Sequence, residues 1–109
     1  MGITKTDLFT EKQNELALFA KAFAHPARIA ILEHLLKSKQ CINSDLVKEL
    51  GLAQATISQH LKELKNIGLI KGSIDGTSMC YCIDSVKWNE VENQLIDFLG
   101  AYKRGGRVC

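Results

Sequence analysis

The residues with the clearest chemistry lie in segment 54–64, where apolar and polar side chains recur at helical spacing. Successive residues of a helix are rotated by about 100°, so residues three or four apart share a face. Ile57, Leu61 and Leu64 therefore lie together and can hold the helix on the rest of the molecule. The opposite face carries small or hydrogen-bonding residues, with two more at its flanks: Ala55, Ser58, Gln59 and Lys62, flanked by Gln54 and Thr56.

This polar face suits the edges of DNA bases and the phosphates beside them. Gln59 can pair bidentately with adenine, Ser58 can serve several bases, and Ala55 can contact a thymine methyl group. Threonine and lysine suit phosphate contacts, and two lysines further along can contact flanking phosphates. The predicted DNA contacts are Gln54, Ala55, Thr56, Ser58, Gln59, Lys62, Lys65 and Lys71.

The alternative is an ordinary amphipathic helix with a solvated outer face. Such a face would alternate glutamate and lysine, and here that alternation begins only with Lys62, Glu63 and Lys65. The absence of a carboxylate before Glu63 favours DNA reading. His60 lies beside the apolar stripe, so we expect a partly buried, hydrogen-bonded histidine rather than a base reader.

The flanking segments predict the elements that must position this helix. Helical patterns cover 10–24, 26–37, 45–50, 54–66 and a last stretch from 85 to 99, and strands are expected at 69–74 and 77–84. Asp75-Gly76 between the strands is a strong hairpin signal. A short helix, a turn at Gly51 and a longer helix form a helix-turn-helix, and the hairpin adds a wing. The predicted fold class is mainly α with a small β hairpin, a winged helix-turn-helix.

Length and composition agree with one domain spanning 1–109, with 100–109 as a mobile tail. The 109 residues are 46% hydrophobic and 24% charged, with a formal net charge of +2, which permits nucleic-acid binding without demanding it. The sequence contains no stretch of about 18 apolar residues, so no membrane span is predicted. Neither a G-x-S-x-G elbow nor a phosphate-binding loop occurs, so we expect a non-enzyme in the cytoplasm.

Four cysteines could respond to a soft ion or an oxidant. Cys80 and Cys82 are two residues apart on a predicted strand and so share a face, and Cys109 or Cys41 could add a third thiol. Thiolates select copper(I), zinc or a trivalent arsenical. A redox thiol pair and small strand residues without a sensory role remain the alternatives.

Several blocks, in order, resemble ArsR-type winged helix repressors over about residues 17–99. They are 24–32 (AHPARIAIL), 45–52 (DLVKELGL), 54–64 (QATISQHLKEL), Gly68-Leu69-Ile70 and Asp75-Gly76. The resemblance implies a homodimer, held by the first and last helices, that represses a promoter until an inducer binds. The apolar residues that fit this interface are Leu16, Phe19, Phe23, Leu95, Phe98 and Leu99.

The family's known metal sites do not carry over to this sequence. One uses a Cys-x-Cys pair at the start of the short helix, where only Cys41 is present. The other uses Asp and His on the last helix, which here offers Asp97, Glu90 and Glu92 but no histidine. The fold needs no cofactor, and a soft metal or arsenite is a candidate inducer. The alternatives are a regulator that responds through redox thiols and a winged-helix module that binds proteins.

Overall fold

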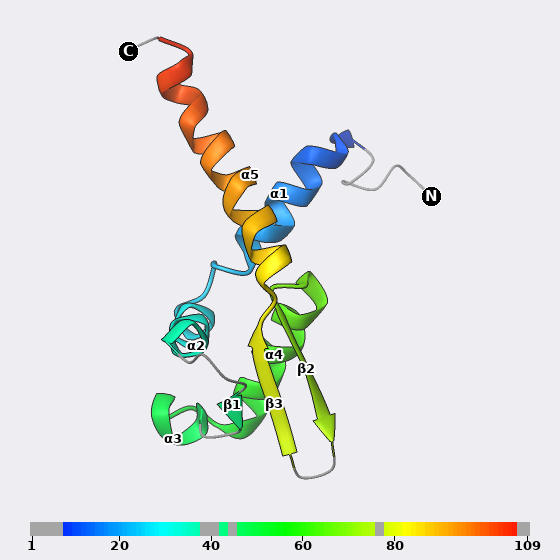
Figure 1. The fold of residues 1–109 in the computed structure, drawn as a ribbon, viewed down its shortest axis with the longest axis vertical. Coiled ribbons are helices and arrows are strands. Elements are labelled where there is room, and N and C mark those ends of the chain that lie inside the picture. Colours follow the sequence, from blue (N-terminus) through cyan, green and yellow to red (C-terminus); the bar gives the residue numbers. More distant parts are fainter. Residues whose placement is uncertain (1–7, 38–41, 44–45, 76–77, 107–109) are drawn as a thin grey trace.

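The computed structural model describes residues 8–37, 42–43, 46–75 and 78–106. Its elements, in chain order, are α1 (Glu11–Lys21), α2 (Pro26–Lys37), β1 (Ile42–Asn43), α3 (Leu46–Leu50), α4 (Gln54–Ile67), β2 (Ile70–Asp75), β3 (Ser78–Ile83) and α5 (Ser85–Arg104). Helices α2, α3 and α4 and the strands form a body, and α1 and α5 project from one end of it (Figure 1). The predicted fold class is confirmed.

Local signals account for four of the helix boundaries. Thr10 and Gln13 form a capping box at the start of α1, in which each side chain bonds the other's backbone N–H at 3.0 Å. Helix α2 begins at Pro26, whose missing N–H costs nothing in a first turn. Helix α4 ends at Gly68 in the left-handed conformation, with φ of 98°. Asp84 caps α5 by accepting from the Lys87 N–H at 3.1 Å.

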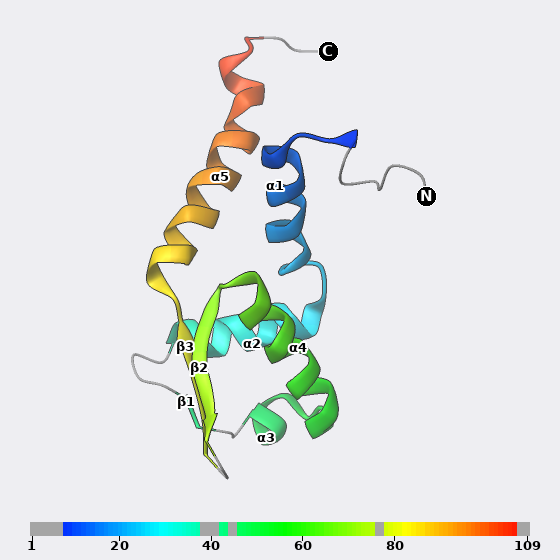
Figure 2. The ribbon, with the colours of Figure 1, turned by 90° about the vertical axis from the view of Figure 1, so that its right-hand side faces the viewer.

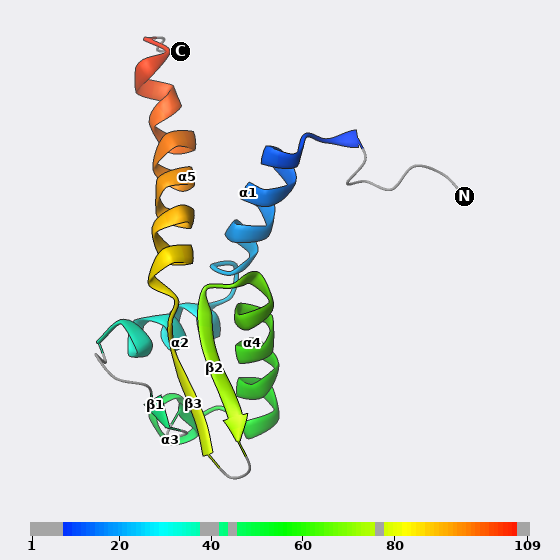
Figure 3. The same ribbon diagram turned by 45° about the vertical axis from the view of Figure 1, so that its right-hand side comes forward.

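The strands form an antiparallel sheet in the order β1-β3-β2. Its register pairs Ile70 with Ile83 and Gly72 with Tyr81. Glycine is required at 72, because a Cβ there would lie 2.0 Å from the carbonyl oxygen of Cys80. Strands β2 and β3 form the wing, which lies beside α4 (Figure 3).

One hydrophobic core joins the helices to the sheet. Buried side chains from α1, α2, α3, α4, the wing and α5 all belong to it, and they include Phe19, Ile31, Leu46, Leu64, Leu69, Tyr81 and Val91. Figure 2 shows how α2 and α4 lie against the sheet, with α1 and α5 together above them. No helix among the described residues is long and apolar enough to cross a bilayer.

Three sequence expectations need correction. The predicted tail is wrong for its first residues, because α5 continues through Gly100 to Arg104, whose guanidinium donates to the carbonyl and carboxylate oxygens of Asp97. Asp75 pairs with Ser78, so the connection is not the predicted 75–76 pair but residues 76 and 77, which lie outside the described residues. Strand β1 was not predicted, because two residues are too few to show an alternating pattern.

Core packing around α4 sets the first prediction. Leu64 is 0% exposed, so Leu64→Ala should lower the free energy of unfolding by about 2–5 kcal/mol, through lost transfer energy and the cavity left behind. Urea denaturation followed by circular dichroism measures the change. The matched control is Leu36→Ala on the exposed side of α2, which should change stability by less than about 0.5 kcal/mol. Equal effects of the two changes would contradict the packing described here.

Candidate nucleic-acid interface

Helix α4 presents the two faces that its spacing predicts. Ile57, Leu61 and Leu64 are buried against the body. The residues proposed to contact DNA lie on the outer side: Gln54, Ala55, Thr56, Gln59 and Lys62 are exposed, and Ser58 is half-buried. The Gln54 side-chain amide donates to the Ser58 hydroxyl at 3.2 Å, one turn along the helix. The outer face is therefore assembled from small and hydrogen-bonding groups.

The lysines proposed to contact flanking phosphates lie on two different elements. Lys65 is exposed in the last turn of α4, and Lys71 is exposed on β2, where it pairs with Cys82. They lie on either side of the junction at Gly68, where the chain passes from α4 into the wing. The elements that carry them, α4 and β2, are adjacent in Figure 3.

A buried polar cluster holds the inner side of α4. Arg28 of α2 donates through Nε to His60 Nδ1 at 3.2 Å, pairs through Nη2 with Glu63, and donates through Nη1 to the Lys21 carbonyl at 2.6 Å. The ring of His25 lies 4.6 Å from that of His60. His60 is 8% exposed, which confirms the expectation of a buried, hydrogen-bonded histidine.

The charges of this cluster shape the outer face as well. Glu63 pairs with Arg28 rather than projecting among the predicted base readers, and the first turn of α4 has no acidic residue. The pKa of His60 is lowered, first by burial and then by the neighbouring His25 and Arg28, against an opposing effect of Glu63. His60 is therefore neutral near pH 7, and its Nδ1 can accept from Arg28.

Sequence reasoning missed the roles of Arg28, Glu63 and His25. The block at 24–32 contains both His25 and Arg28. Its spacing, however, does not reveal that its arginine reaches residues 32 and 35 positions further along the chain. Arg28 lies on the apolar face of α2, and this is the signal that could have indicated a hydrogen-bonding or charged side chain beside it, since buried charges are paired.

The thiols on β3 share one face of the strand. Tyr81 between them is buried in the core, and Cys80 and Cys82 are half-buried. Cys41 and Cys109, the other predicted ligands, lie outside the described residues. No group of three histidine, cysteine or carboxylate side chains within the described residues could hold a metal ion. The structure thus places two of the four predicted thiols on one face of β3.

The predicted dimer residues divide into three groups. Phe98 and Leu99 are 62% and 70% exposed on α5, whereas Leu16, Phe23 and Leu95 are half-buried between α1 and α5. Phe19 is 1% exposed and packs in the core of the single chain, so it has no surface to offer a partner. Its place on the helical face of α1 could not distinguish internal packing from dimer packing.

Further apolar residues of α5 are exposed in the single chain. Ile96 and Tyr102 of α5 are exposed, as is Leu18 of α1. These three residues are not among the predicted dimer residues. Ile96 and Leu99 line an apolar groove with Phe23, whose ring meets that of Trp88 edge-on. Large exposed apolar surface of this kind marks a contact site.

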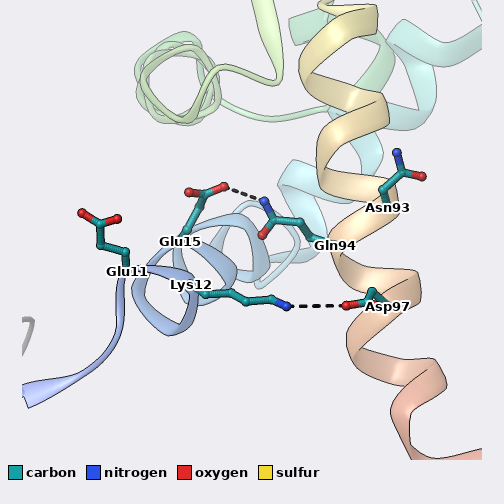
Figure 4. A pocket seen from close by; sticks show the side chains of 6 residues that line it. All are labelled: Glu11, Lys12, Glu15, Asn93, Gln94 and Asp97. Atoms are coloured by element: carbon teal, nitrogen blue, oxygen red, sulfur yellow. Dashed lines mark hydrogen bonds and ion pairs between the residues drawn. The ribbon is translucent and has the colours of Figure 1, made fainter. Parts of the chain in front are cut away.

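A polar cleft lies between α1 and α5, and polar contacts cross it (Figure 4). The Gln94 amide donates to the Glu15 carboxylate at 2.6 Å, and Lys12 lies 3.6 Å from Asp97. These contacts cross from one helix to the other, as the dashed lines in Figure 4 show. The two helices therefore form one layer, which we call the α1–α5 layer.

The fold and site define a winged helix-turn-helix protein, and comparison with known proteins identifies its family. The family model described as "Bacterial regulatory protein, arsR family" matches residues 25–71. The chain is 38% identical to an uncharacterized HTH-type transcriptional regulator of Methanocaldococcus jannaschii, MJ1325, over 82% of this chain and 99% of that protein. The chain belongs to the ArsR family of transcriptional regulators, which are not enzymes.

Two mycobacterial proteins give shorter sequence matches. The uncharacterized HTH-type transcriptional regulator Rv0081 of Mycobacterium tuberculosis is 39% identical over 62% of this chain. The HTH-type transcriptional repressor SmtB of the same organism is 41% identical over 56% of this chain. The matches span only 59% and 44% of these relatives. The crystal structure of Rv0081 superposes with a TM-score of 0.60 and 28% identity, covering 87% of this chain and 98% of that chain.

Proposed function

We propose that this chain is a dimeric, sequence-specific DNA-binding repressor that an inducer releases from its promoter. The observation that carries the proposal is the outer face of α4, which holds small and hydrogen-bonding side chains with no carboxylate before Glu63. Membership of the ArsR family and the similarity to a protein named as a repressor support it. Because its partner is DNA, we place its action in the cytoplasm.

The second helix of a helix-turn-helix enters the major groove and reads base edges with its N-terminal half. In this chain that helix is α4, and Gln54, Ala55, Ser58 and Gln59 lie in its N-terminal half. Lys62, Lys65 and Lys71, with Thr56, contact phosphates in this proposal. A carboxylate ends the wing's first strand at Asp75, so the wing adds little to base reading.

Base reading by α4 predicts a contrast between two neighbouring positions. Gln59→Ala should cost about 1–3 kcal/mol on the preferred duplex and relax specificity there, whereas Lys62→Ala should weaken binding to all sequences alike. The preferred duplex is first selected from random sequence with the wild-type protein, and affinities are measured by mobility shift across a salt series.

The wild-type shift should weaken steeply with salt, because phosphate contacts release counterions. A protein-interaction module predicts no shift at any salt concentration, and that result would remove the DNA proposal. Equal losses for Gln59→Ala on preferred and unrelated duplexes would instead contradict base reading by α4.

We propose that a second copy of the chain covers the α1–α5 layer. Phe98 and Leu99 are large apolar groups exposed to solvent in the single chain, and burial of such groups is the main favourable term in association. A symmetric pair would present two copies of α4 to half-sites about 34 Å apart. An imperfect palindrome is the expected operator.

The dimer proposal predicts that a charge on this surface separates the subunits. Leu99→Glu should give a monomer in analytical ultracentrifugation and a loss of the palindrome shift, because a buried unpaired charge is costly. Leu36→Glu, at an exposed leucine of α2 outside the layer, is the matched control and should stay dimeric. A dimeric Leu99→Glu protein would place the interface elsewhere.

For the inducer we propose a soft metal or metalloid held by the thiols of Cys80 and Cys82. Residues two apart on a strand are about 6.6 Å apart along it. A disulfide needs Cβ atoms within about 4.5 Å, so the strand disfavours a bond between these two cysteines. A thiophilic ion that bridges two sulfurs does not require so close an approach. The wing packs against α4, so an ion on β3 can bias the DNA-binding conformation.

The thiol proposal predicts that replacing both cysteines abolishes release but not binding. Cys80→Ser with Cys82→Ser should shift the preferred duplex normally and stay bound when arsenite, copper(I), zinc or cadmium releases the wild-type protein. Wild-type release by an oxidant alone would favour the redox alternative. If none of these ions releases the wild-type protein, the soft-ion site is abandoned.

A further inference from the structure

Three elements meet at the guanidinium of Arg28. It reaches the last residue of α1 through the Lys21 carbonyl, and it reaches α4 through His60 and Glu63. Its side chain is 11% exposed, and the groups around it are charged and polar groups of different elements. A buried cation is tolerated only where its donors find acceptors, and these three contacts supply them.

The geometry of the guanidinium fixes α4 in more than one direction. Its N–H groups form a rigid planar fork, so the positions of its partners are set together. Nε and Nη2 bind His60 and Glu63, which are three residues apart and so lie one above the other on α4. Two such contacts restrain both the rotation of the helix about its axis and its position along it.

The restrained residues directly follow two of the predicted DNA contacts. His60 comes after Gln59, and Glu63 comes after Lys62. Any rotation of α4 that broke the inner contacts would also turn Gln59 away from the base edge that it is proposed to contact. The Lys21 contact ties the same guanidinium to α1, which the Glu15–Gln94 and Lys12–Asp97 contacts tie to α5.

We propose that Arg28 is a positioning residue for DNA recognition, which sets the orientation of α4 and links it to the α1–α5 layer. This inference rests on the proposed function, because it concerns how α4 reads bases. Arg28 itself lies inside the molecule and does not touch DNA in this proposal. Loss of its fork should therefore reduce discrimination between sequences more than it reduces attraction to phosphates.

The hydrogen bond between Arg28 and His60 can also be broken by protonation of His60. The groups that face it are His25, Arg28 and Glu63. When His60 is neutral, Nδ1 accepts from Arg28, and when it is protonated, it becomes a cation with two donors beside a guanidinium. Protonation of His60 therefore removes the contact without changing any residue.

The pH window follows from the direction of the shift. The pKa of His60 in the folded protein lies below its ordinary value of 6.5, chiefly because of burial. The Arg28–His60 bond is present while His60 is neutral, and it is lost as pH falls through the lowered pKa. Discrimination by the wild-type protein should follow this loss.

The test compares Arg28→Lys with Arg104→Lys, a matched change at an arginine on the far part of α5. Both variants keep the charge, but lysine cannot reproduce the fork. Affinities for the selected duplex and for an unrelated duplex are measured at one salt concentration and pH 7.5, well below the melting temperature of each protein. Arg28→Lys should lose about ten-fold or more in the affinity ratio, with little change on the unrelated duplex, and Arg104→Lys should match wild type.

A merely structural role predicts a lower melting temperature with an unchanged affinity ratio, and that result would overturn the proposal. If Arg28→Lys does not fold, His60→Gln tests the proposal in its place, because glutamine offers an acceptor for Arg28 but does not titrate. The wild-type ratio should fall as the pH is lowered below 6.5, the ordinary pKa of histidine, and His60→Gln should remove that fall. His34→Gln, at a histidine of α2 outside the cluster, is the control and should keep it.

A pH profile that is identical in wild type and His60→Gln would also overturn the proposal. Failure of the proposed function looks different, because the wild-type protein would then select no preferred duplex. The two failures are therefore separated by the first step of the experiment.

Discussion

A guanidinium can remain inside a small protein only while each of its N–H directions meets an acceptor. In this chain that condition applies to Arg28, whose acceptors lie at the end of α1 and on two successive turns of α4. The apolar residues of the core press α4 onto the body, but hydrophobic contact is not directional. The polar contacts of Arg28 are directional, so they fix the rotation of α4 about its axis. That rotation determines which side chains of α4 are exposed.

The two faces of α4 are thus set by different forces. Ile57, Leu61 and Leu64 are buried by the hydrophobic effect, whereas His60 and Glu63 are held by hydrogen bonds and charge. With Glu63 paired to Arg28, the outer face keeps lysine as its charged group, as a surface for phosphates requires. An inner salt bridge therefore helps to determine the electrostatics of the outer surface.

The α1–α5 layer combines two kinds of surface. Polar contacts between Glu15 and Gln94 and between Lys12 and Asp97 connect the two helices within the chain. The apolar side chains of Phe98 and Leu99 remain exposed. A protein of this size buries a limited core, so the second copy that we propose would complete the burial of these residues. Through Lys21, this layer is also connected to the cluster that holds α4.

The periodicity of the sequence was sufficient to predict the helix-turn-helix, the wing and the two faces of α4, because these features depend on neighbours within one or two turns. It also predicted the burial of His60, which lies beside the apolar stripe. Periodicity could not tell whether Phe19 packs inside the chain or against a partner, since both uses need an apolar face.

Helix α5 continues to Arg104 although Gly100 lies within it, because a single glycine in a helix costs only about 1 kcal/mol and does not by itself end the helix. The partners of Arg28 lie 32 and 35 residues away, and local spacing contains no information about such distances. The sequence by itself determined which residues lie on the outer face of α4, the face that we propose enters the groove. Only the tertiary structure decided how they are aimed, because the aim is set by the packing of α1, α2 and α4 around one buried charge.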